Sequence, residues 1–559
     1  MAVLADSATQ LLTQAIRGYG VETGIHFDVY EADYNQVNNE VFNRGSHLYA
    51  LQPAFVLVNL STEHLLKVFY HTSREQRGHF AREQADYIKS LYDAISSGCG
   101  SKVIVNTFPE INDAVFGNYA SKEPASFLYQ LRKLNLLVME LSQANPGLFV
   151  CDLLALQSEL GYKNIFDPKM YINADMVYNI DFLPHVAKAV TDIVLAVTGT
   201  FKKCVIVDLD NTMWGGIIGD DGMEGIQIGY LGLGKAFTEF QLWLKELKER
   251  GILIAVCSKN TASIAKEPFE HHDDMVLRLE DITLFVANWE NKADNIRFIQ
   301  ETLNIGFDSM VFLDDNKFER EMVKAGVPGV LVPDLPEDPA EYLPFLRSLN
   351  LFETASFTKE DEQRTRLYQQ ESGRALLQKS FASEDEFLQG LEMKSEAAPF
   401  NNYTAPRVAQ LSQRSNQFNL RTVRYTEQEI LDISRSPDYY TLSLTLEDKF
   451  GGHGLIGAVI MKRAGNETLF IDTWIMSCRV LKRGMENFTL NCLAELAGRD
   501  GFRKITGEYI PTKKNGLVKE HYAGLGFSLL ENGCWELDLA TYVEKKIFIQ
   551  PIGKGVMEP

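Results

Sequence analysis

The sequence predicts an α/β protein of three domains, two with mainly parallel sheets and a last one of the α+β class. A chain of 559 residues is too long for one hydrophobic core. From residue 1 to about 200, and again from 201 to about 350, apolar runs alternate with helical stretches, which is typical of parallel α/β folds. After residue 400 the apolar runs follow one another closely, as in an antiparallel sheet. We therefore place the domains at 1–200, 201–355 and 356–559.

Short apolar runs bounded by polar residues mark the strands of the two parallel domains. In the first domain these runs are 54–59, 102–106 and 148–152, and in the second they are 205–208, 254–258 and 310–314.

The last domain begins with a charged helical connector, 357–391. Strands of an antiparallel sheet are expected at 441–445, 455–461 and 468–474. An amphipathic helix follows, because apolar residues then recur at helical spacing: Met485, Phe488, Cys492, Leu493 and Leu496.

Composition excludes several classes of function. The chain carries 55 basic and 75 acidic residues, a net charge of −20 that repels nucleic acid. No apolar run approaches the length needed to span a bilayer, and the first residues lack the basic and apolar regions of a signal peptide. Seven scattered cysteines without a C-x-x-C pair argue against a disulfide framework or a zinc site. We expect a cytoplasmic protein with no membrane or nucleic-acid partner.

Four segments of the second domain predict a phosphoryl-transfer site. Asp208 and Asp210 follow the first apolar run, Ser258 ends the second, Lys292 comes next, and Asp314 and its acidic neighbour follow the third. The carboxyl ends of parallel strands meet at one edge of a sheet, where ligands bind. Each segment alone is more often a solvated strand end, but four in this order are hard to obtain by accident.

Each residue type suits one part of that chemistry. Asp208 can attack phosphorus, and Asp210 can move the proton to and from the leaving oxygen. Thr212, Ser258 and Lys292 are candidate phosphate-binding residues. Oxygen ligands for Mg²⁺ are expected from the carboxylates of Asp208 and Asp314 and from the backbone carbonyl of Asp210. Asp315 is an alternative ligand. The glycine-rich insertion 213–222 is suited to be a flap over the site.

The four segments resemble the motifs of the haloacid dehalogenase (HAD) phosphatase superfamily. The resemblance implies a Rossmannoid α/β domain that uses Mg²⁺, with Asp208 as nucleophile and Asp210 as acid and base.

A cysteine in the last domain is a second candidate centre. Cys478 follows an apolar strand and precedes Arg479, Lys482 and Arg483, just before a helix. Cationic neighbours and a helix N-terminus favour the nucleophilic thiolate, whereas a buried structural cysteine is the alternative. Cys204 and Cys257 lie inside apolar strands and are read as structural.

The same region resembles the GNAT acyltransferases. Arg479 and Gly484 fit their R-x-x-G-x-G turn for the pyrophosphate of coenzyme A, but Lys482 stands where the first glycine belongs. Tyr522, in the segment 520–527, resembles the tyrosine that protonates the departing thiolate in that fold.

Taken together, residues 200 to 545 resemble the FkbH-like family. The match rests on Asp208–Gly216 with Gly219–Gly222, Asn416–Asn419, Asp448–Gly457, Ser477–Leu481 and Pro511–Asn515. The resemblance implies an enzyme that takes the glyceryl group of 1,3-bisphosphoglycerate, removes phosphate and loads the phosphopantetheine thiol of an acyl carrier protein for polyketide-type biosynthesis.

In that reading Cys478 attacks the acyl carbon. Asn416, Gln417 and Asn419 are candidate ligands of the glyceryl hydroxyls, although a structural turn explains them equally well. Arg479 and Tyr522 are further candidates for contact with the acyl group or the carrier.

The first domain resembles the SGNH hydrolases, which have a flavodoxin-like parallel sheet. Asp6-Ser7 matches their nucleophile block with Ala5 in place of glycine, and Asp181–His185 approximates their late Asp-x-x-His block with one residue too many. An active Ser7–His185 pair needs hydrogen-bond geometry that this spacing leaves open. We favour a non-catalytic docking domain.

Two other functions remain open from the sequence. One is a HAD phosphatase coupled to transfer of another acyl group, to a sugar or an amine, and Lys482 keeps this alternative open. The other is a non-catalytic scaffold of a biosynthetic complex, against which the intact set of phosphatase motifs argues.

Overall fold

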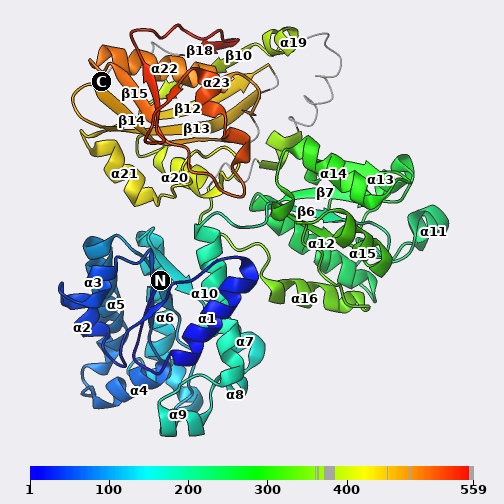
Figure 1. The fold of residues 1–559 in the computed structure, drawn as a ribbon. Coiled ribbons are helices and arrows are strands. Elements are labelled where there is room, and N and C mark those ends of the chain that lie inside the picture. Colours follow the sequence, from blue (N-terminus) through cyan, green and yellow to red (C-terminus); the bar gives the residue numbers. More distant parts are fainter. Residues whose placement is uncertain (359–360, 362–363, 370–383, 450, 478–479, 553–559) are drawn as a thin grey trace. The chain divides into compact units, whose positions relative to one another are not determined.

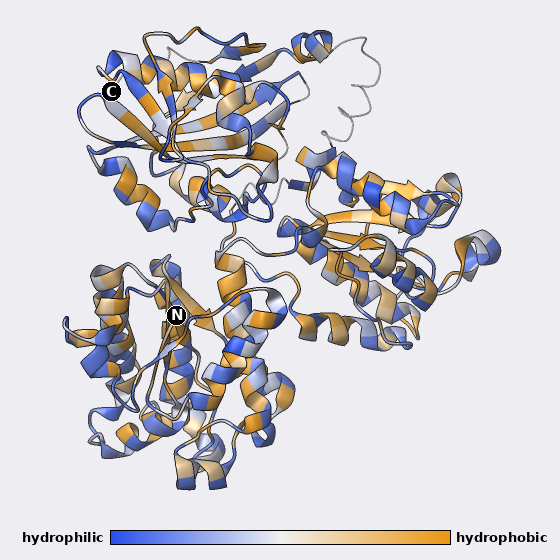
Figure 2. Ribbon diagram, viewed as in Figure 1, coloured by the Kyte–Doolittle hydropathy of each residue, from blue (hydrophilic) through white to orange (hydrophobic). Residues whose placement is uncertain are grey.

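The computed structural model describes residues 1–358, 361, 364–369, 384–449, 451–477 and 480–552. The chain divides into two compact units, Met1–Leu195 and Ala196–Pro559. Figure 2 shows apolar residues concentrated on the strands and polar residues on the outer helices. Among the residues described, no helix is both long enough and apolar enough to cross a bilayer.

The first unit, drawn in blue to cyan in Figure 1, is built on a five-stranded sheet. All neighbouring strands are parallel, and their order is β2-β1-β3-β4-β5. The predicted strands at 54–59, 102–106 and 148–152 are confirmed, and β2 is an additional short edge strand. The inner strands are apolar on both faces because helices cover both. The strands are β1 (Ala2–Ala5), β2 (Tyr30–Glu31), β3 (Phe55–Asn59), β4 (Lys102–Asn106) and β5 (Leu148–Cys151).

Local signals fix where the helices of this unit begin. The hydroxyl of Ser61 accepts a hydrogen bond from the amide of His64, and that of Ser126 accepts one from Tyr129, so both serines cap a helix. The helices are α1 (Gln10–Thr23), α2 (Val37–Phe42), α3 (His47–Leu51), α4 (Thr62–His71), α5 (Phe80–Cys99), α6 (Phe127–Ala144), α7 (Leu153–Leu160), α8 (Tyr162–Ile165), α9 (Pro168–Ala174) and α10 (Leu183–Val197).

The second unit begins with a four-stranded parallel sheet of order β8-β7-β6-β9. The three predicted strands are confirmed as β6 (Cys204–Val207), β7 (Leu253–Ser258) and β9 (Met310–Leu313), and β8 (Leu284–Ala287) adds an edge. The helices are α11 (Ile218–Gly225), α12 (Gly234–Glu249), α13 (Ala262–His271), α14 (Lys292–Leu303), α15 (Lys317–Gly326) and α16 (Tyr342–Leu349).

The remainder of this unit contains a larger, mostly antiparallel sheet of order β16-β17-β15-β14-β13-β12-β10-β18, with β11 paired to β12. The predicted strands at 441–445, 455–461 and 468–474 are confirmed within its three longest members. The strands are β10 (Met393–Ser395), β11 (Ala397–Ala398), β12 (Tyr439–Asp448), β13 (Gly451–Arg463), β14 (Thr468–Met476), β15 (Lys504–Gly507), β16 (Ser528–Leu529), β17 (Trp535–Asp538) and β18 (Ile549–Pro551).

The predicted amphipathic helix is also confirmed. It is α22 (Met485–Arg499), whose apolar side chains enter the core of the large sheet. It connects β14 to β15, and these two strands are parallel to each other. The other helices are α19 (Glu384–Gly390), α20 (Ala405–Arg414), α21 (Glu427–Arg435) and α23 (His521–Leu525). Of the predicted connector, residues 364–369 are helical and 370–383 lie outside the described residues.

Candidate active site

The predicted site residues of the second unit lie at the carboxyl edge of the small parallel sheet. Asp208 directly follows β6, Ser258 is the last residue of β7, and Asp314 directly follows β9. These strands are adjacent in the order β7-β6-β9, so their carboxyl ends come together. Lys292 is the first residue of α14, after β8. The sheet therefore positions four side chains that lie up to 106 residues apart in the chain.

Lys292 joins two of the carboxylates. Its ammonium lies 3.0 Å from Oδ1 of Asp208 and 2.6 Å from Oδ2 of Asp314, and all three side chains are buried. Burial alone lowers the pKa of a lysine, but the two carboxylates outweigh burial and raise the pKa of Lys292 above its usual range. The lysine stays charged, and it partly neutralises the acids around it.

The acidic side chains form a compact oxygen cluster. One carboxylate oxygen from each of Asp208, Asp314 and Asp315 lies within 4.8 Å of the others. Burial and the charge of Asp208 raise the pKa of Asp314 to about 7, against the influence of Lys292. An oxygen-only donor set with mutual repulsion fits a divalent cation such as Mg²⁺. The structure thus brings Asp315 into this cluster beside the predicted Asp208 and Asp314.

Asp210 lies apart from that cluster and is held by three donors. Its Oδ1 accepts hydrogen bonds of 3.0 Å from the indole of Trp214 and from the amide of Ile218, and its Oδ2 accepts one of 3.1 Å from Asn260. Burial raises the pKa of Asp210, which suits a group that donates and accepts a proton.

The two candidate phosphate-binding hydroxyls, of Ser258 and Thr212, differ in their hydrogen bonding. Ser258 is buried, and its hydroxyl has no hydrogen-bond partner among the described residues, so it is available to a ligand. The hydroxyl of Thr212 is occupied by Asp315: it accepts from the amide at 3.1 Å and contacts Oδ1 at 3.4 Å. Thr212 therefore supports the acidic loop, and its contact with phosphate stays a prediction.

Three residues of the site did not emerge from the sequence. Asn260 and Trp214 hold Asp210, and Arg320 donates hydrogen bonds to the backbone carbonyls of Asp314 and Asp315, at 2.8 and 2.6 Å. Trp214 belongs to the predicted glycine-rich flap, where it is fully buried. Its position four residues after Asp210 was the only available signal.

The segment 416–419, which follows α20, is partly structural. Asn416 donates to the carbonyl of Gly199 at 2.9 Å, and Asn419 is fully buried and donates to Ser415 at 3.3 Å. Gln417 has no hydrogen-bond partner among the described residues and lines a pocket. The turn interpretation accounts for the two asparagines, and Gln417 remains the candidate ligand.

The other candidates of this region are Tyr522, Cys478 and Arg479. Tyr522 lies in the hydrophobic core with its ring packed against Phe527 and Trp535. Its buried hydroxyl lacks a partner among the described residues, and burial raises its pKa. Cys478 and Arg479 lie outside the described residues, so their predicted roles stay predictions.

In the first unit, the structure does not join the predicted serine and histidine. Ser7 is buried and lies two residues after the end of β1, whereas His185 is exposed on α10. No hydrogen bond joins them in the described part of the chain. Asp6 instead accepts two hydrogen bonds of 3.0 Å from the amide of Ser61. Burial raises the pKa of Asp6 to about 6 and that of Glu63, in α4, to about 7.

Comparisons with known proteins match the first unit to a family model and a larger part of the chain to a crystal structure. A family model described as "FkbH, N-terminal domain" matches residues 1–195. The crystal structure of the N-terminal part of the protein BF1531 from Bacteroides fragilis, containing a phosphatase domain complexed with Mg, is 51% identical. The match covers 64% of this chain and 94% of that one, with a TM-score of 0.62. A search of curated proteins finds no significant match.

Acetyltransferase structures also match. The ribosomal-protein-S18-alanine N-acetyltransferase from Escherichia coli is 13% identical over 27% of this chain and 98% of that one, with a TM-score of 0.21. The GNAT domain of S. lividans PAT is 18% identical over 25% of this chain and 89% of that one, with a TM-score of 0.21.

Proposed function

The chain belongs to the FkbH-like family, and from this premise we propose that it is a Mg²⁺-dependent phosphatase and glyceryl transferase. Its substrate would be 1,3-bisphosphoglycerate, and its product a glyceryl thioester on an acyl carrier protein. The observation that carries the phosphatase half is the contact of Lys292 with both Asp208 and Asp314 at the carboxyl edge of the sheet.

For phosphate removal, a carboxylate oxygen of Asp208 attacks phosphorus and the bond to the leaving oxygen breaks. Asp210, with its raised pKa, gives that oxygen a proton. Asp210 then takes a proton from water, which attacks the phospho-aspartate and releases inorganic phosphate. Lys292 and the Ser258 hydroxyl would hold the phosphoryl oxygens during both steps.

The cluster of Asp208, Asp314 and Asp315 would hold Mg²⁺. When bound, the cation neutralises the phosphoryl oxygens and lowers the repulsion between nucleophile and substrate. The Mg named with the related Bacteroides fragilis structure supports this choice. Phosphatase activity should vanish in a chelator and return with added Mg²⁺.

For acyl transfer, the thiolate of Cys478 attacks the acyl carbon of the acyl phosphate. The carbon–oxygen bond breaks, phosphate leaves with the electron pair, and a thioester remains on the protein. The phosphopantetheine thiol of the carrier then attacks this thioester, and Cys478 leaves as a thiolate. Arg479 and Lys482, which follow Cys478 in the chain, would favour the anionic sulfur in both steps, whereas Arg483 is buried and pairs with Asp448 at 3.2 Å.

Intact-protein mass spectrometry after incubation with 1,3-bisphosphoglycerate and Mg²⁺ tests this proposal. We expect an adduct of glyceryl mass, which disappears when the carrier protein is added and is then found on the carrier. Phosphate release without any adduct would favour transfer of a different acyl group. The absence of both phosphate release and adduct would indicate a non-catalytic scaffold.

A further inference from the structure

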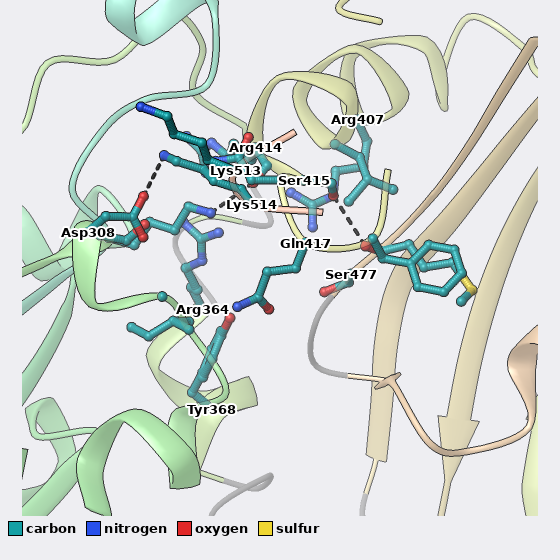
Figure 3. A pocket seen from close by; sticks show the side chains of 18 residues that line it. Asp308, Arg364, Tyr368, Arg407, Arg414, Ser415, Gln417, Ser477, Lys513 and Lys514 are labelled. Carbon is teal, nitrogen blue, oxygen red and sulfur yellow. Dashed lines mark hydrogen bonds and ion pairs between the residues drawn. The ribbon is translucent and has the colours of Figure 1, made fainter. Parts of the chain in front are cut away.

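A cationic pocket lies at the other edge of the small parallel sheet. It has a volume of about 400 Å³ and is lined by Lys203, just before β6, and by Ser309, just before β9. These are the amino ends of the strands whose carboxyl ends carry Asp208 and Asp314. The opposite wall comes from residues 414–418, at and after the end of α20, and from Ser477 after β14 (Figure 3). The pocket is therefore separate from the phosphatase site.

Positive charge dominates the described residues that line this pocket. The only acid among them is Asp308, which forms an ion pair of 2.5 Å with Lys514. Six cations come from four separate stretches of the chain: Lys203, Arg364, Arg407, Arg414, Lys513 and Lys514. In a chain with a net charge of −20, such a local excess of cations needs an explanation. An anionic ligand provides one, because it would offset the mutual repulsion of these groups.

The buried part of the pocket is rigidly built. Arg414 is buried, its guanidinium pairs with Asp361, and it donates a hydrogen bond of 3.0 Å to the carbonyl of Ser356. Burial and the nearby charges of Arg364 and Arg407 lower the pKa of Arg414 to about 9, despite Asp361. Lys203 donates to the carbonyl of Arg414 at 2.8 Å. Arg414 and Lys203 are thus held in place by contacts with the protein.

Two polar side chains of the pocket are available to a ligand. Gln417 extends into the pocket, and its amide has no hydrogen-bond partner among the described residues (Figure 3). Lys513 is exposed and forms no ion pair within the described part of the chain. Together they add an amide and an ammonium to the fixed cations.

These two side chains come from two segments that the sequence singled out: 416–419, which holds candidate ligands of the glyceryl hydroxyls, and 511–515, which had no assigned role. In both segments the asparagines hold the backbone: Asn515 is fully buried and donates to the carbonyl of Asn419 at 3.0 Å. Gln417 of the first segment and Lys513 and Lys514 of the second line the pocket. The two segments therefore meet at one place and present their polar side chains to the same space.

We propose that this pocket binds a phosphate monoester at a site distinct from Asp208. Arginine and lysine side chains are the usual partners of phosphate oxygens, and a volume of this size suits a small ligand. A few apolar side chains, Ile305, Leu411, Phe418 and Met476, leave room for a short carbon chain beside the phosphate. Two sources share this chemistry, a phosphorylated three-carbon substrate and the phosphate of a phosphopantetheine arm.

The position of the pocket also suggests its use. Ser477, which lines it, directly precedes Cys478 in the chain. A phosphate held here would bring the attached acyl or thiol group close to Ser477. This use rests on the proposed function, whereas the binding of a phosphate monoester does not.

Isothermal titration of the full chain in chelator tests the binding. The probes are glycerol 3-phosphate and phosphopantetheine, with glycerol and pantetheine as the matched compounds without phosphate. The variant is Lys513→Gln/Lys514→Gln. The control is Lys519→Gln/Lys546→Gln, which removes the same charge from exposed lysines paired with Glu520 and Asp385.

We expect both phosphate compounds, or one of them, to bind the parent, with a dissociation constant about tenfold or more higher in the pocket variant. The control variant should bind like the parent, and both variants should hydrolyse p-nitrophenyl phosphate at the parent rate. The tighter of the two probes identifies the source of the phosphate. Equal affinities in parent and pocket variant, equal weakening in both variants, or no binding to the parent would overturn the proposal. Binding without any glyceryl adduct would reject only the proposed function.

Discussion

Lys292 donates a hydrogen bond of 2.6 Å to Asp314, and both side chains are almost completely removed from solvent. The same ammonium contacts Asp208 at 3.0 Å, so one cation serves two buried carboxylates. A third acid, Asp315, lies within 4.8 Å of them. The local charge is therefore negative, and the site depends on Lys292 and on a bound cation to remain ionised.

Replacing Lys292 by glutamine should expose this dependence. Without the ammonium the buried carboxylates repel one another, and we expect a loss of roughly 3–5 kcal/mol of stability in chelator. Mg²⁺ should restore more of the melting temperature in the variant than in the parent. Phosphatase turnover should fall by about 10²–10³-fold. Scanning calorimetry with and without Mg²⁺ measures the first effect, and an unchanged response to Mg²⁺ would contradict it.

Asp208→Asn tests the nucleophile. The substitution keeps the size of the side chain but removes the attacking charge, so phosphate release should fall by about 10³-fold or more while the fold persists. Asp294→Asn is the matched control, because Asp294 is exposed and paired with Arg297 on α14. Release of phosphate near the parent rate by Asp208→Asn would refute the phosphatase site.

Asn260→Ala tests how Asp210 is held. The variant loses the donor to Oδ2 of Asp210, which disfavours the ionised carboxylate and raises its pKa further. If Asp210 acts as the acid, the basic limb of the kcat/KM profile should move to higher pH. The rate at its maximum should fall about tenfold, the scale of one hydrogen bond to a charged group. A lower rate with an unmoved profile would mean that Asn260 acts only on structure.

Glu63 should make the first unit sensitive to pH. Burial raises its pKa from 4.5 to about 7, so the folded state prefers the protonated carboxyl. The stabilising effect is present below pH 4.5 and is lost as pH rises through 7. Glu63→Gln should therefore stabilise this unit at pH 8, on the order of 2–3 kcal/mol, and have little effect at pH 4.

Hydrogen exchange of the amides of β3 is the suitable measurement, because all five tryptophans of the chain lie beyond residue 195. Glu22→Gln, an exposed position of the same unit, serves as the control. At each pH, exchange in Glu63→Gln is compared with exchange in the parent. A larger slowing of exchange by the substitution at pH 4 than at pH 8 would contradict the prediction.

Cys478→Ser separates the two proposed activities. The glyceryl adduct and carrier loading should be lost, while hydrolysis of p-nitrophenyl phosphate at Asp208 continues. Cys534→Ser, another cysteine after β14, should load the carrier like the parent. Carrier loading at the parent rate by Cys478→Ser would show direct transfer without a covalent stage.

The sequence predicted the strands and the acidic cluster well for a physical reason. Buried parallel strands are continuous apolar runs, and their carboxyl ends share an edge, so Asp208 and Asp314 could be placed together before any geometry was known. The edge strand β8 is less buried and was missed. Asn260 was missed because its contact with Asp210 is made by a loop, across 50 residues.

The cationic pocket could not be predicted at all. Its charges come from residue 203, from the connector, from α20 and from the segment 511–515, and no periodicity relates them. Only the fold brings them together. The segments 416–419 and 511–515 were visible as motifs, but the contact of Asn515 with Asn419 that aligns them was not.

The acidic cluster and the cationic pocket lie at opposite ends of the small sheet, and for the proposed function this has a kinetic consequence. The strand β6 that separates them is four residues long, or about 13 Å. In the proposed function, a three-carbon molecule bound at one end would have to dissociate before it reached the other, so phosphate removal and acyl transfer would exchange their small ligand through solvent. Unlabelled substrate added during turnover should then dilute a labelled intermediate. A ligand covalently attached to a carrier protein would not be diluted in this way, because the arm of the carrier prevents its release into solvent.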